Sequence, residues 1–103
     1  MNYYKIIDIK DVKTFKTRTD GRYPLRIGSI ISLDTLNLWI GQCAIFEYHK
    51  DNQGNDKEGS LRTSLIQEIE EFNTMTIIYT LNSVYYLKKC DKNGKEKIYY
   101  KRR

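Results

Sequence analysis

Short runs of β-branched and aromatic residues, separated by turn residues, make up most of this chain. Alternation of apolar and polar positions over about four to eight residues is the pattern of a half-buried strand. Such runs predict strands over 3–12, 25–33, 42–50, 74–80 and 83–90. The stretch 12–19 is also rich in Thr and Phe, and it predicts a further strand or a bent extension of the first.

One segment, 61–72, fits two patterns. Apolar side chains recur in it at helical spacing, and Ser64 with Gln67 matches a capping box, which favours a helix. Its neighbours are predicted strands, which favours a kinked strand in the same sheet. We expect the strand, and the helix is the alternative.

Turn residues separate the predicted strands. Asp20-Gly21, followed by Pro24, marks the first turn. An irregular or 3₁₀ turn is expected between Asp34 and Gly41. The strands therefore follow one another at intervals of about ten residues, which is typical of antiparallel β domains.

These elements predict a single β-rich domain over 1–103. We expect a mostly β fold, a small antiparallel barrel or strongly bent sheet of the SH3-like kind, with at most one short helix. A chain of 103 residues suffices for one core and leaves no room for a second domain. The segment 51–60 has no apolar side chain and is expected to be an exposed loop.

Residues 91–103 are predicted to form a C-terminal hairpin arm. With Asn93 and Gly94 as the two central turn residues, Cys90 faces Lys97. Side-chain alternation then turns one member of each tyrosine pair, Tyr85 and Tyr100, toward the core. The outward side, which we name the C-terminal basic-aromatic face, carries Tyr86, Lys88, Lys97, Tyr99, Lys101 and Arg103.

Such a face has the chemistry of a nucleic-acid platform. Tyrosine rings stack on bases, and lysines neutralise phosphates. The same residues also suit an edge strand without a ligand, because Tyr has high β propensity and Lys discourages edge-to-edge aggregation. Both interpretations stay open on the sequence alone.

Charge favours acidic partners. The formal net charge is +5 and the isoelectric point is near 9.2. No apolar run approaches the roughly 18 residues that span a bilayer, and the first residues do not form a secretory leader. We therefore expect a cytoplasmic protein without a membrane partner. Cys43 and Cys90 lie in unrelated segments, so buried reduced thiols are expected.

Few residues suggest catalysis. His49 is the only histidine, so no Cys-His or His-His metal set can be built around it, and a surface histidine is expected. Glu68 and Glu70 share a face of the expected strand, where a solvated pair is favoured over an acid–base pair or a cation site. Phosphate-binding glycine loops and zinc-protease motifs are absent from the sequence. We expect no catalytic residue, no metal, no cofactor and no enzyme activity.

Trp39 is the only tryptophan of the chain. It lies between Leu38 and Ile40, and we expect it to fill the core after the third strand. The alternative is an exposed Trp39, which would be a natural contact for a partner.

The segment 61–87 contains "RTS" at 62–64 and "TLNSVYYL" at 80–87. This pattern, RTS followed by T-x-N-S-x-Y-x-L, resembles small β-rich proteins of bacteria and mobile elements. The resemblance covers less than a third of the chain and implies a compact β module without known catalysis. The hydroxyl and amide residues of the pattern are of a kind that closes hairpins and strand ends.

Two functions follow from these observations. The favoured one is a non-enzymatic binding module that contacts nucleic acid, or a nucleic-acid-binding protein complex, through the C-terminal basic-aromatic face. The alternative is a phage or mobile-element protein that inhibits a host defence nuclease by protein–protein binding, in the manner of anti-CRISPR proteins. A basic inhibitor cannot mimic the acidic charge of DNA, so it would cover an RNA- or protein-binding surface.

Overall fold

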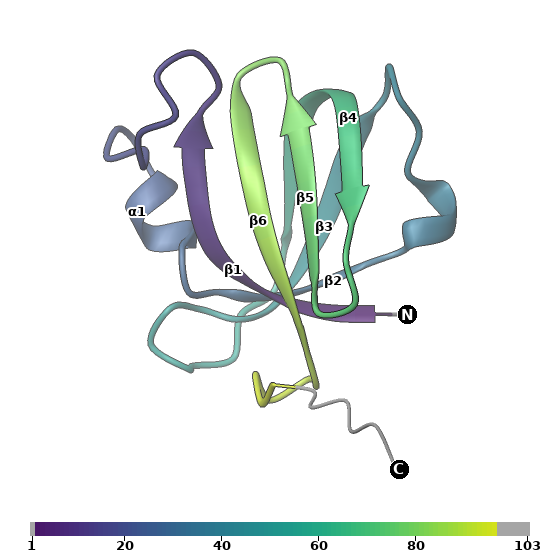
Figure 1. The fold of residues 1–103 in the computed structure, drawn as a ribbon. Helices are drawn as coiled ribbons and strands as arrows, with labels where there is room; N and C mark the ends of the chain where they lie inside the picture. Colours follow the sequence, from purple (N-terminus) through teal and green to yellow (C-terminus); the bar gives the residue numbers. More distant parts are fainter. Residues whose placement is uncertain (1, 97–103) are drawn as a thin grey trace, which may run out of the picture.

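Six antiparallel strands close into a barrel in the computed structural model, which describes residues 2–96 (Figure 1). Each strand pairs with its neighbour in sequence, and the first pairs with the last. The strands are β1 (Asn2–Asp11), β2 (Ile30–Leu33), β3 (Cys43–Lys50), β4 (Ser60–Glu71), β5 (Met75–Thr80) and β6 (Ser83–Cys90). The predicted small antiparallel barrel is confirmed, and the segment 61–72 is a strand.

The barrel closes through β1. The start of β1 pairs with β2, and nearly its whole length pairs with β6. A bulge between Ile6 and Asp8 shifts the alternation, so that Ile6 and Ile9 are both fully buried. β1 bends across the barrel (Figure 1), as a strand does at a bulge.

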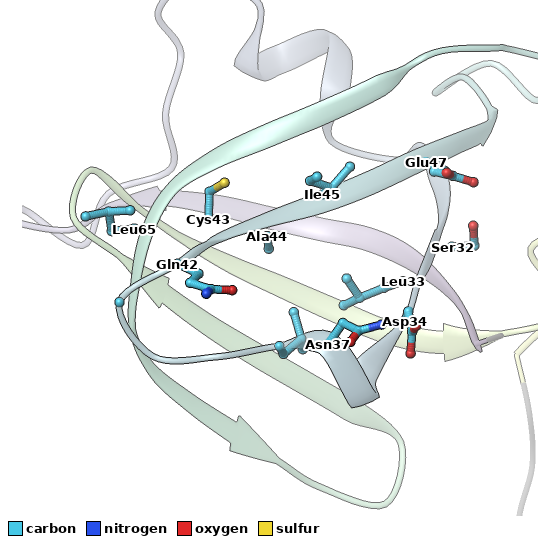
Figure 2. A pocket seen from close by; sticks show the side chains of 12 residues that line it. Ser32, Leu33, Asp34, Asn37, Gln42, Cys43, Ala44, Ile45, Glu47 and Leu65 are labelled. Carbon is cyan, nitrogen blue, oxygen red and sulfur yellow. Dashed lines mark hydrogen bonds between the residues drawn. The ribbon is translucent and has the colours of Figure 1, made fainter.

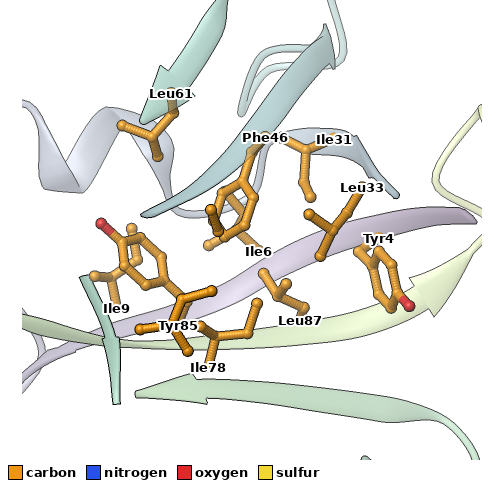
Figure 3. Close-up of a cluster of buried hydrophobic side chains, with 12 residues drawn as sticks. Tyr4, Ile6, Ile9, Ile31, Leu33, Phe46, Leu61, Ile78, Tyr85 and Leu87 are labelled. Carbon is orange, nitrogen blue, oxygen red and sulfur yellow. The ribbon is translucent and has the colours of Figure 1, made fainter. Parts of the chain in front are cut away.

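The core lies inside the barrel and takes side chains from every strand (Figure 3). The rings of Phe46 and Tyr85 meet edge to face with their centroids 5.3 Å apart. Burial raises the pKa of the Tyr85 hydroxyl to about 12. Tyr85 and Leu87 point inward, as the hairpin pattern predicts.

The predicted strand at 12–19 is wrong. The carboxylate of Asp11 accepts hydrogen bonds from the amides of Lys13 and Thr14, at 2.8 and 3.0 Å. Phe15 then adopts a left-handed backbone with φ of 57°. This aspartate turn ends β1 and overrides the β propensity of the residues that follow it.

The predicted strand at 25–33 is shorter than expected. The turn at its start is a single turn of helix, α1 (Tyr23–Arg26), with Pro24 in its first positions. The chain becomes extended at Ile27, and β2 begins only at Ile30. Arg22 and Arg26 thereby lie at the two ends of one helical turn.

The connection between β2 and β3 holds the expected 3₁₀ turn, η1 (Thr35–Asn37), capped by the carboxylate of Asp34. Trp39 follows η1 and is 61% exposed, so its predicted place in the core is wrong. The end of this loop is tied to β4 by two hydrogen bonds of 2.8 Å, one from the Gly41 amide to the Ile66 carbonyl and one from the Ile66 amide to the Gln42 carbonyl. The loop therefore crosses outside the barrel. Leu36, Trp39 and Ile40 are left on the surface, whereas Leu38 packs against the core.

Two hairpin turns, 51–55 and 91–95, share one construction. In each, the aspartate amide donates to the carbonyl of the fifth residue, and the glycine amide donates to the aspartate carbonyl. The aspartate Oδ1 accepts hydrogen bonds from the amides of the third and fifth residues of the turn, and all four of these bonds are 2.9 Å long. Residues 52–59, between β3 and β4, are exposed.

The second of these turns corrects the predicted register of the C-terminal hairpin. The turn has three central residues, 92–94, rather than Asn93 and Gly94 alone, and Cys90 pairs with Glu96 instead of Lys97. The Asp91 carboxylate favours the longer turn because it binds two amides of the loop.

Candidate functional site

Tyr86 and Lys88 are the two members of the C-terminal basic-aromatic face within the described residues. Tyr86 is half-buried on the outside of the barrel, opposite Ile77 of β5 and Asp8 of β1. The Lys88 ammonium forms an ion pair of 2.8 Å with Glu96. This part of the face is thus mixed in charge, and its lysine already has a carboxylate partner.

The other four members, Lys97, Tyr99, Lys101 and Arg103, lie outside the described residues. Their place on an outward ladder stays a prediction. That prediction rests on a register in which Cys90 pairs with Lys97, whereas Cys90 pairs with Glu96 in the structure.

A second basic and aromatic surface lies where α1 meets the end of β3 and the start of β4. It encloses a pocket of about 460 Å³, which we name the basic pocket. The basic pocket is lined by Arg22, Leu25, Arg26, Tyr48, Lys57, Glu58, Gly59, Ser60 and Leu61. Sequence reasoning did not find it, because Lys57 lies far along the chain from Arg22 and Arg26 and meets them only in the folded barrel.

Tyr48 organises the cations of the basic pocket. The Lys57 ammonium lies 4.3 Å from the centroid of the Tyr48 ring. Burial raises the pKa of the Tyr48 hydroxyl, and the charge and hydrogen bond of Arg26 partly offset this rise. Arg26 and Lys57 are thus positioned by the same tyrosine.

Arg18 does not line the basic pocket, but it contacts Tyr23 of α1 and Ser83 of β6. Its guanidinium pairs with Asp20 at 2.8 Å, which lowers the pKa of that carboxyl group, and it donates to Ser83 Oγ at 2.9 Å. It also lies 4.1 Å from the centroid of the Tyr23 ring, and Arg26 lies 4.9 Å from the same centroid. Arg18 therefore fixes α1 to the barrel, and its charge is already paired.

An apolar groove of about 590 Å³ lies on the flank of the barrel between β3 and the loop that carries η1 (Figure 2). Its lining comes from 32–34, 37–38, 41–45, 47 and 65. Large apolar side chains are exposed along it, including Ile45 at 48% and Leu65 at 45%. Trp39 and Ile40 are exposed in the bordering loop. The Cys43 thiol lines the groove and is half-buried, whereas the Cys90 thiol is buried in the core.

His49 lies at the surface, as the sequence predicts, but it is not fully exposed. It is partly buried, its Nε2 lies 2.7 Å from Ser32 Oγ, and its ring meets Tyr3 edge to face. Glu70 accepts a hydrogen bond from the Tyr79 hydroxyl, which raises the pKa of Tyr79 to about 12. Among the described residues, no group of three or more His, Cys, Asp and Glu side chains could hold a metal ion.

The hydroxyl residues of the RTS and T-x-N-S patterns form hydrogen bonds with backbone amides of the barrel. Thr63 Oγ1 accepts the Ala44 amide at 2.9 Å, and Ser64 Oγ accepts the Asn82 amide at 3.1 Å. Thr80 Oγ1 accepts the Ser83 amide at 3.1 Å. These bonds satisfy backbone groups where strands end or bulge, so the pattern is explained by structure.

Comparison with protein-family models, with curated proteins and with solved structures found no match to this chain. Over residues 2–96, no helix has the length and apolarity that crossing a membrane requires. The candidate surfaces therefore rest on their own geometry.

Proposed function

We propose that the protein is a small β-barrel binding module, without catalysis of its own, that binds single-stranded nucleic acid through the basic pocket. The observation that carries this proposal is a set of three cations on one pocket, Arg22, Arg26 and Lys57, none of which forms an ion pair within residues 2–96. The described part of the C-terminal basic-aromatic face supports binding less, because Lys88 is paired with Glu96. A cytoplasmic location belongs to the same proposal.

The chemistry of the basic pocket suits a single strand. Unpaired cations attract phosphates without first breaking an ion pair. Arginine guanidinium planes and the exposed side chain of Leu25 offer surfaces for unstacked bases, which a double helix does not present. The tyrosine contacts of Arg26 and Lys57 reduce the conformational entropy that binding would cost.

Fluorescence polarisation with labelled single-stranded DNA and RNA of mixed sequence tests the proposal. Neutralising three phosphates predicts a slope of about −2 for log affinity against log salt, from about −0.7 for each phosphate. Raising the salt from about 50 to 200 mM should therefore weaken binding roughly 15- to 20-fold. Absence of binding at the lower salt would sink the nucleic-acid function.

Charge-neutral variants locate the contact. Arg22→Gln combined with Lys57→Gln should bring the slope to about −0.7 and weaken binding, because two of three phosphate contacts are lost. Lys5→Gln combined with Arg62→Gln is the matched control, since both residues are exposed strand positions outside the basic pocket. Equal losses in both double variants would show that net charge, and not the basic pocket, sets the affinity.

The C-terminal basic-aromatic face is a separate arm of this experiment. Tyr86→Ala combined with Tyr99→Ala removes two stacking rings that the sequence predicts to be outward. A several-fold loss in this variant, with the basic-pocket variant unaffected, would move the contact to the C-terminal face.

One observation favours the alternative, a phage or mobile-element inhibitor of a host nuclease that acts by protein binding. Trp39 and Ile40 are more than half exposed beside the apolar groove, as hot-spot residues of protein interfaces are. A defence nuclease bound in this way should stay bound after nucleic acid is digested, and Trp39→Ala should release it. Release by digestion alone would contradict direct protein contact.

A further inference from the structure

The seam between β2 and β3 has the fewest residue pairs of the barrel. It joins three pairs and ends at Ser32 opposite Glu47, whereas β1 and β6 join eight. β2 ends at Leu33, but β3 extends back to Cys43, so 43–46 have no partner in the β2–β3 register of the described strands. The apolar groove lies along this part of β3 (Figure 2).

The backbone of this part of β3 presents hydrogen-bonding groups to the apolar groove. The Ala44 amide donates to Thr63 of β4 at 2.9 Å. The Tyr48 amide donates to the Gly59 carbonyl, on the same side, also at 2.9 Å. Peptide groups alternate sides along an antiparallel strand, so those of Ile45 point the other way, into the groove.

The walls of the apolar groove carry only one sign of charge. Its floor is formed by the buried side chains of Leu33 and Ala44. Its charged lining residues are Asp34 and Glu47, both acidic, on a chain with a formal net charge of +5. Asp34 already caps η1, whereas Glu47 is exposed and forms no ion pair within residues 2–96.

We propose that the apolar groove binds an extended segment of a partner protein, which adds to β3 as a strand. Main-chain hydrogen bonds to Ile45 supply affinity, as in other cases of strand addition. Apolar side chains at alternate positions of the segment lie over Leu33 and Ala44, and a Lys or Arg of the segment pairs with Glu47. This inference rests on the apolar groove alone and is independent of the nucleic-acid proposal.

Selection from a phage-displayed library of random peptides tests this inference on the full chain. Enriched peptides should alternate apolar and polar positions and carry at least one Lys or Arg. In a synthetic peptide of the enriched sequence, N-methylation of every second amide should weaken binding roughly tenfold, and N-methylation of the intervening amides should not. The Ile45 amide should exchange with solvent more slowly when the peptide is bound.

Two variants with matched controls tie the peptide to the apolar groove. Ile45→Asp should abolish binding, whereas Phe72→Asp, at another exposed apolar side chain, should not. Glu47→Lys should weaken binding about tenfold, whereas Glu71→Lys, at an exposed position at the end of β4, should change it less than about twofold. Failure to enrich peptides above the Ile45→Asp protein, or binding that tolerates N-methylation at every position, would overturn the inference.

Discussion

The carboxylates of Asp51 and Asp91 each hold a hairpin turn closed. Hydrogen bonds from backbone amides, first from Asn55 for Asp51 and from Lys95 for Asp91, lower the pKa of both groups. The folded pKa therefore lies below the unfolded value of about 3.9. The ionised carboxylates stabilise the fold at every pH above that value, and the contribution is lost as the pH falls through the folded pKa.

This sign makes a prediction at the residue scale. Asp51→Asn keeps the size and an acceptor oxygen but removes the charge, so it should lower the urea midpoint at about pH 6, where the wild-type carboxylate is ionised. As the pH falls below the unfolded pKa of about 3.9 and through the lower folded pKa, the wild-type carboxylate becomes protonated, and the two midpoints should converge. A midpoint difference that stays constant from about pH 6 to 3 would show that the charge does not hold the turn.

The two turns also allow a matched comparison at the scale of the element. Gly54 and Gly94 take the same place in them, with φ of +84° and +86°. A Cβ at Gly54 would meet open space, but at Gly94 it would approach Ile30 Cδ1 to 2.9 Å. Gly94 thus faces Ile30 of β2, whereas Gly54 faces open space.

Alanine at these positions should separate backbone strain from packing. Gly54→Ala should destabilise the protein by about 1 kcal/mol, the cost of a left-handed non-glycine residue. Gly94→Ala should cost about 1 kcal/mol more, because Ile30 must move. Urea unfolding measures both values.

The control for this comparison is Ile30→Val, which removes the Cδ1 atom that a Cβ at Gly94 would meet. In that background the two alanine variants should cost the same. If the excess cost of Gly94→Ala persists without Cδ1, packing on Ile30 is not its cause.

Elements also show what sequence patterns can and cannot predict. Alternation identified β3 and β5 closely, because one face of each is more buried than the other. The bounds of β6 were also predicted, although its first three residues are buried on both faces. Alternation failed at 12–19 and at Trp39, where a carboxylate–amide turn and a loop outside the barrel decide the conformation. The basic pocket was missed because Arg22 and Lys57 become neighbours only through the closure of the barrel.

At the scale of the whole molecule, charge and apolar surface are separated. The basic pocket carries three cations and one carboxylate, whereas the charged residues that line the apolar groove are both acidic. Glu47 and Tyr48 are consecutive residues of β3, and their side chains belong to the groove and the pocket respectively. The two sites share no lining residue, so a ligand in one of them does not occupy the other.

The pairing of the whole barrel makes β2–β3 the seam that should open first. Local openings begin where few hydrogen bonds and contacts must break, and this seam has three residue pairs against eight between β1 and β6. In hydrogen exchange followed by NMR, the Ile45 amide should exchange at least about tenfold faster than the Ala44 amide, which is bonded to Thr63. The Ile6 amide of β1, which donates to the Ser29 carbonyl at 3.0 Å and belongs to a fully buried residue, should be protected up to global unfolding. Equal protection of Ile45 and Ala44 would mean that the seam is closed along its whole length, and that β3 has no free edge for a partner strand.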